Sequence, residues 1–141
     1  MRKIKLFEDF NLEKEKLTDG DDKSFRIEKV RQNLEDIFVE LRDDKYSVKV
    51  NALQYDVTPN THYEVILVRN SGIDFSELSE YVMMFKDYLS EYEYENMKWH
   101  SWSLGHSNYR IDLDFDKIEK NRIEEFFISN AIGIKISFFL V

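Results

Sequence analysis

The spacing of apolar residues predicts two amphipathic helices. Within residues 24–41 they recur every three or four positions, on one helical face: Ile27, Val30, Leu34, Ile37, Phe38 and Leu41. A second stripe of this kind covers residues 75–92: Phe75, Leu78, Tyr81, Val82, Phe85, Leu89 and Tyr92. Ser24 is the expected N-cap of the first helix, and Asp74 with Glu77 has the spacing of a capping box for the second.

Alternating apolar residues predict a first hairpin between these helices. Residues 46–57 alternate in two phases, which a continuous strand accommodates only with a bulge, expected near Ala52. Turn residues around Pro59 follow, and residues 62–69 predict the returning strand.

A second hairpin and a final strand follow the second helix. Residues 97–104 and 109–115 flank a turn at Gly105, and the apolar side chains of the latter strand, from Tyr109 to Phe115, are expected to face the core. Residues 132–141 alternate as a strand that is too apolar to remain an exposed edge, so it should pair inside the sheet or be covered by a partner subunit.

Between these strands, Asp116 and Glu119 are candidate caps for a third helix that carries Ile118, Ile123 and Phe126. The element order predicts an α+β fold in two layers. Two hairpins and the C-terminal strand form an antiparallel or mixed sheet, and the helices pack mainly on one face.

The N-terminal segment reads as a separate unit. Ile4, Phe7 and Phe10 share one helical face beside Leu6, but three turns are too short to be stable alone in water. Residues 11–23 are mostly polar and predict a solvated linker. We therefore expect a leader and linker over residues 1–20 and a single α+β domain over residues 21–141.

Composition narrows the classes of function. The chain of 141 residues has a formal charge of −8, which disfavours direct binding to nucleic acid. It has no cysteine and only four glycines, so Cys-ligated zinc, thiol catalysis and glycine-rich phosphate loops are excluded. No apolar run is long enough to span a membrane. We expect no cofactor and no bound metal.

Two sets of polar residues are candidate chemical sites. Asp112, Asp114 and Asp116 lie two apart on a predicted strand, an arrangement that a hard cation can use but that any water-facing strand also shows. The histidines, His62, His100 and His106, lack the i, i+4 spacing of a zinc helix. A metal-dependent hydrolase or nucleotide-cleaving enzyme built on these residues is the alternative to a non-catalytic protein.

Aromatic residues of the second hairpin give the best indication of a binding face. Trp99 and Trp102 are three apart on a strand and so face opposite sides, which leaves at least one of them off the helix-covered face. An exposed Trp is a common binding anchor. We take Trp99, Trp102, His100 and Tyr109 as the candidate binding residues.

The leader, Lys3-Ile4-Lys5-Leu6-Phe7-Glu8-Asp9-Phe10, resembles the K-I-K-L-F-E-x-F head of many proteins of large tailed phages. Some such phages direct internal proteins into the prohead by short leaders that are cut after Leu-x-Glu, and Leu6-Phe7-Glu8 fits this pattern. The element order also resembles that of the small α+β chaperones of type III secretion, which bind extended segments as dimers, although no motif matches them.

These observations predict a small acidic phage accessory protein that binds a host or phage protein. Inhibition of a host defence enzyme is one such role, and the chain is expected to act in the host cytoplasm, as a monomer or a homodimer. A second alternative is an internal head protein, packaged through its leader and located inside the virion.

Overall fold

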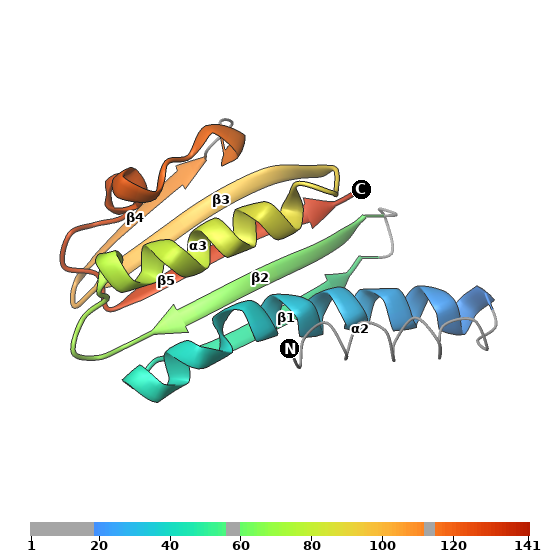
Figure 1. The fold of residues 1–141 in the computed structure, drawn as a ribbon, viewed down its shortest axis with the longest axis horizontal. Coiled ribbons are helices and arrows are strands. Elements are labelled where there is room, and N and C mark those ends of the chain that lie inside the picture. The colour runs from blue at the N-terminus through green and yellow to red at the C-terminus, as the bar shows by residue number, and fades with distance from the viewer. Residues whose placement is uncertain (1–18, 56–59, 112–114) are drawn as a thin grey trace.

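The computed structural model describes residues 19–55, 60–111 and 115–141 and confirms an α+β fold in two layers. One antiparallel five-stranded sheet has the order β1-β2-β5-β3-β4, and the helices lie on one of its faces (Figure 1). The strands are β1 (Ser47–Gln54), β2 (Thr61–Val68), β3 (Tyr94–Ser103), β4 (His106–Ile111) and β5 (Gly133–Leu140). The helices are α2 (Asp19–Phe38) and α3 (Phe75–Leu89), with 3-10 segments η1 (Val39–Asp44), η2 (Phe115–Lys117) and η3 (Lys120–Phe126).

Some predictions fall on parts of the chain outside the described residues. They concern the leader residues Ile4, Leu6, Phe7 and Phe10, the turn at Pro59, and Asp112 and Asp114. No helix in the described part of the chain is long and apolar enough to cross a membrane.

The final strand, β5, lies in the middle of the sheet. It pairs with β2 on one side and with β3 on the other, which confirms that it is paired inside the sheet. Ile134, Ile136 and Phe138 are fully buried on the helix-covered face, and the ring of Phe138 packs against Phe85 of α3 and Tyr63 of β2. The apolar strand therefore forms the floor of the core.

Helix α2 begins earlier than the apolar periodicity predicts. It starts at Asp19, so Ser24 is inside the helix and is not its N-cap, and the linker prediction is wrong for residues 19–23. The buried residues Leu34, Ile37 and Phe38 hold its second half against the sheet. Most helical stability in proteins comes from this kind of packing, so local composition is a weak guide to where the helix starts.

Helix α3 begins as predicted at Asp74, but the reciprocal half of the capping box is absent. The Asp74 carboxylate accepts hydrogen bonds from the backbone N–H groups of Ser76 and Glu77. The backbone N–H of Asp74 donates instead to the hydroxyl of Tyr46, 2.9 Å away. Glu77 faces Asp44 rather than the backbone of Asp74.

The predicted bulge near Ala52 is wrong. Strand β1 pairs with β2 in unbroken register from Ser47 to Gln54. The irregularity lies in β3 instead, between Glu95 and Lys98, where Asn96 has a φ of 57°. Without a bulge, the apolar residues in the second half of β1 stay on the face away from the helices. Leu53 lies on that face and is 39% exposed.

Two further predictions, one about the second hairpin and one about the segment that follows it, are wrong. All six residues of β4 are exposed, so this edge strand has no core face, and Tyr109 and Ile111 are 65% and 66% exposed. The expected third helix is replaced by the two 3-10 segments η2 and η3, which bring Phe115 and Ile123 into the core. The irregular spacing of apolar residues there suits short turns better than a continuous helix.

Candidate functional site: the open face of the sheet

The helices leave the other face of the sheet uncovered within the described residues (Figure 1). Strand register brings side chains from all five strands together there. We call this surface the open face; it comprises Lys49, Asn51 and Leu53 of β1, His62, Glu64 and Ile66 of β2, Lys98, His100 and Trp102 of β3, Tyr109 and Ile111 of β4, and Lys135, Ser137 and Phe139 of β5, with Tyr55 and Glu95 at one end.

Three of the four predicted binding residues meet at one end of the open face. The rings of His100 and Tyr109 stack across β3 and β4 with centroids 3.9 Å apart and planes 7° from parallel. The indole of Trp102 lies 5.0 Å from the imidazole of His100. We call His100, Trp102 and Tyr109 the first aromatic cluster; Tyr109 is its most exposed member.

The fourth predicted binding residue, Trp99, belongs to the core. It is 1% exposed and packs against the rings of Phe115, Phe126 and Phe127. The expectation that the two Trp residues face opposite sides is confirmed, but Trp99 is not accessible to a partner. The burial of Trp99 corrects its assignment as a binding residue.

A second aromatic cluster, which the sequence reading missed, lies at the other end of the open face. The rings of His62 and Phe139 stack at 4.6 Å across β2 and β5, and Tyr55 lies 6.0 Å from His62. The Tyr55 hydroxyl is 3.3 Å from Nδ1 of His62. One sequence signal pointed to this cluster. The apolar alternation changes phase at Leu53 and Tyr55, and these residues lie on the uncovered face.

Lysines occupy the middle of the open face, between the two clusters. A hollow of about 280 Å³ is lined there by Lys98, Lys135, Asn96 and Ser137, with rings of both clusters at its ends. Lys135 pairs with Glu64 at 3.5 Å. Lys98 is exposed and has no ion pair with another described residue. The hollow thus combines an uncompensated positive charge with aromatic walls.

Both histidines that border the hollow favour the neutral form. Burial lowers the pKa of His62, an effect only partly opposed by Glu64 and reinforced by Lys135 and Lys98. Burial also lowers the pKa of His100, with Lys135 as a second cause. Near neutral pH these rings therefore serve as flat, largely apolar surfaces, and the positive charge of the hollow comes from its lysines.

The three histidines do not form one site. His106 pairs with Ser103, an odd number of residues from His100, so it belongs to the opposite face. His62 and His100 pair with Phe139 and Lys135, four residues apart on β5, which corresponds to about 14 Å along the sheet. Among the described residues no group of three His, Asp or Glu side chains is placed to hold a metal ion.

Two larger hollows lie beside η3 and differ from the open face in their charges. The hollow of about 490 Å³ between α3 and η3 contains the Lys120–Glu80 ion pair, and that of about 370 Å³ on the far side of η3 contains the Arg122–Glu125 pair. Both hollows carry opposite charges side by side, whereas the hollow of the open face places Lys98 between two aromatic clusters.

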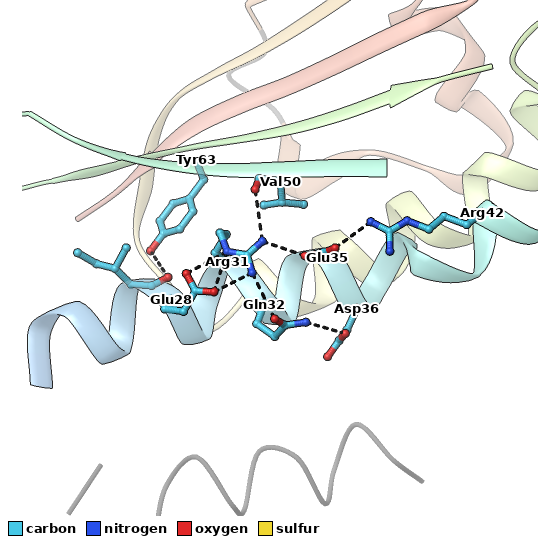
Figure 2. Close-up of polar contacts among 9 residues, drawn as sticks. Glu28, Arg31, Gln32, Glu35, Asp36, Arg42, Val50 and Tyr63 are labelled. Atoms are coloured by element: carbon cyan, nitrogen blue, oxygen red, sulfur yellow. Dashed lines mark hydrogen bonds and ion pairs between the residues drawn. The ribbon is translucent and has the colours of Figure 1, made fainter. Parts of the chain in front are cut away.

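One edge of the sheet is closed by arginine side chains from the α2–η1 region (Figure 2). Arg42 donates to the carbonyl oxygen of Val48 at 2.8 Å, and Arg31 approaches that of Val50 at 3.5 Å. Glu35 links the two guanidinium groups through bonds of 2.8 Å. Burial raises the pKa of Glu35, but its hydrogen bonds to both arginines outweigh that effect and hold the pKa below its usual value.

Searches against protein-family models, curated proteins and solved structures find no significant match to this chain.

Proposed function

We propose that this chain is a small phage accessory protein that acts by binding another protein, and that the open face of its sheet is the binding surface. Inhibition of a host enzyme, such as a defence enzyme, is the role that we propose for this binding. The observation that carries the proposal is the gathering of two aromatic clusters around Lys98, which pairs with no described carboxylate, on a face that no described helix covers.

Aromatic side chains support this reading because they supply large contact areas at a low cost in conformational entropy. Tyr109 and Ile111 are each about two-thirds exposed, and Leu53 and Tyr55 about two-fifths, although all four are apolar or aromatic. Leu53 and Tyr55 lie at the β1 edge of the open face, and Tyr109 and Ile111 lie on β4 at its other edge. Groups of exposed apolar side chains with polar residues between them are typical of interaction surfaces. The leader's resemblance to phage proteins supports the proposed origin.

The hydrolase alternative receives no such support from the described residues. Its histidines are divided between two faces, and the two that share the open face are separated by about 14 Å along the sheet. Ligands of one catalytic metal ion must converge within coordination distance.

The test is a quantitative capture from lysate of phage-infected host cells with three forms of the full chain. Tyr109→Glu places a charge on the open face, whereas Met84→Glu makes a comparable change at a 42% exposed position of α3, on the opposite side of the sheet. We expect the wild type and Met84→Glu to retain the same partner and Tyr109→Glu to lose it. Equal retention by all three forms would contradict the proposal.

A further inference from the structure

The two aromatic clusters lie at a spacing that an extended peptide reproduces. On β5, the first cluster is level with Lys135 and the second with Phe139. Four residues of a strand span about 14 Å, and side chains at positions i, i+2 and i+4 of an extended chain point the same way. The first cluster lies on β3 and β4 and the second on β2 and β5, so the peptide runs obliquely from His100 of β3 to Phe139 of the neighbouring β5. Because adjacent strands are only about 4.8 Å apart, this path is still about 14 Å long and places side chains i and i+4 on the two clusters.

The side chain at position i+2 of such a peptide lies over the middle of the hollow. This position is level with Ser137, which pairs with Lys98 of β3. Lys98 is exposed and unpaired with any described carboxylate, whereas the neighbouring Lys135 already contacts Glu64. A carboxylate at position i+2 provides Lys98 with the missing partner.

Charge complementarity favours an acidic occupant of the open face. Among its described residues there are three lysines, Lys49, Lys98 and Lys135, and two glutamates, Glu64 and Glu95, so with neutral histidines its net charge is +1. The whole chain has a formal charge of −8. The open face is therefore more positive than the chain as a whole.

We propose, building on the protein-binding function above, that the open face recognises an extended acidic segment of its partner. The segment carries an acidic residue flanked, two positions away on each side, by aromatic or large apolar residues. The flanking side chains pack on the two aromatic clusters, and the central carboxylate pairs with Lys98.

Other occupants fit the same surface less well. Residues that share one face of a helix, i, i+7 and i+11, recur about 10.5 and 16.5 Å apart, so neither spacing matches the distance of about 14 Å between the clusters. A second copy that docked by the same face would bring two positively charged surfaces together. A nucleic acid strand carries a negative phosphate at every nucleotide, and a protein of net charge −8 repels it.

The test measures fluorescence anisotropy of dye-labelled peptides against the full chain. The first peptide is Ser-Phe-Ser-Glu-Ser-Phe-Ser; matched peptides replace the central Glu by Gln or Lys, and a fourth shortens the spacing to Phe-Glu-Phe. We expect the Glu peptide to bind most tightly and the Gln peptide up to about fivefold more weakly, the upper range for an exposed ion pair. The Lys peptide should bind more weakly than the Gln peptide, because its charge repels Lys98. The shortened peptide should lose one aromatic contact and bind more weakly still.

The charge-reversal variant Lys98→Glu should invert the preference, so that the Lys peptide binds more tightly than the Glu peptide. Lys98→Gln should abolish the preference, and Met84→Glu should bind like the wild type. Circular dichroism confirms that each variant is folded. Equal binding of Glu and Lys peptides, or an unchanged preference in Lys98→Glu, would overturn the proposal.

Two further measurements distinguish the other occupants and the underlying function. The proposal of an acidic segment would be overturned if a twelve-nucleotide thymidine strand bound more tightly than the Glu peptide. It would also be overturned if the protein formed a dimer that Tyr109→Glu dissociates. If the Glu peptide fails to bind while lysate capture still depends on Tyr109, the acidic segment is wrong and the protein-binding function stands. If capture does not depend on Tyr109, the protein-binding function itself fails.

Discussion

The indole of Trp102 lies directly against the backbone of Gly133. A Cβ atom built on Gly133 would be only 2.1 Å from Cζ2 of Trp102, and the two residues pair across β3 and β5. The glycine therefore makes the space in which the indole lies along the sheet. This contact places Trp102 next to His100 and so helps to form the first aromatic cluster.

Replacing Gly133 by Ala should displace the indole and disturb the first aromatic cluster. We expect the free energy of unfolding to fall by about 1 to 3 kcal/mol, the usual cost of overpacking a close contact. Urea unfolding measures this change. In a Trp102→Ala background the same substitution should cost clearly less, because the clash is gone. Equal costs in both backgrounds would show that the contact with Trp102 is not the cause.

The pattern of apolar residues was sufficient to predict an element where that element buries one face. The stripe from Leu78 through Val82 and Phe85 to Leu89 predicts α3 and its buried side, and the apolar alternation of β5 predicts a strand that pairs inside the sheet. In both cases the pattern is local and strong. Period-two alternation also predicts that Trp99 and Trp102 face opposite sides.

Which Trp lies in the core depends on pairings between residues far apart in sequence. Trp102 faces away from the helices because its strand pairs with β5 so that Gly133 lies beside it. The same dependence explains the error at β4: its alternation resembles a half-buried strand, but it lies at the edge of the sheet. The second aromatic cluster joins Tyr55, His62 and Phe139 across three segments, which local periodicity cannot predict.

The arginines that cover the β1 edge should protect it from pairing with another chain. Arg42→Ala removes the bond to the Val48 carbonyl and one bond to Glu35, and we expect it to reduce the free energy of unfolding by about 1 kcal/mol. The double variant Arg31→Ala/Arg42→Ala exposes two edge carbonyls and should self-associate at high concentration. Light scattering after size-exclusion chromatography measures the association.

Arg122→Ala is the matched control for that experiment. Its ion pair with Glu125 lies at the surface of η3 and contacts no edge carbonyl, so the variant should retain the oligomeric state of the wild type. Association of Arg122→Ala to the same extent as the double variant would contradict a specific role for the β1 edge.

The stacked ring of Tyr109 should control the titration of His100. Burial lowers the pKa of His100 below its ordinary 6.5, and the Tyr109 ring covers one face of the imidazole. Tyr109→Ala should therefore raise the pKa toward 6.5, which a proton NMR titration of the histidine resonances measures. Met84→Glu, on α3, should leave it unchanged. A pKa that does not move in Tyr109→Ala would show that other groups bury the ring.

The carboxyl group of Glu77 should make stability depend on pH between about 4.5 and 6. A hydrogen bond with Asp44, followed by burial and the nearby negative charges of Asp44 and Asp74, raises the pKa of Glu77 from 4.5 to about 6. In this window the folded state binds more protons than the unfolded state, so the contribution of Glu77 to stability is present below pH 4.5 and is lost as the pH rises through 6.

Glu77→Gln should remove this dependence, because an amide donates to Asp44 at every pH. Urea unfolding at intervals between pH 4 and 7 should therefore show a shallower decline for Glu77→Gln than for the wild type. Glu80→Gln is the matched control, since Glu80 lies three residues further along α3 and pairs with Lys120, away from Asp44. Carbon-13 NMR measures the pKa of Glu77 directly. A pKa near 4.5 would mean that the folded and unfolded states have the same proton affinity, and it would contradict the hydrogen bond between Glu77 and Asp44.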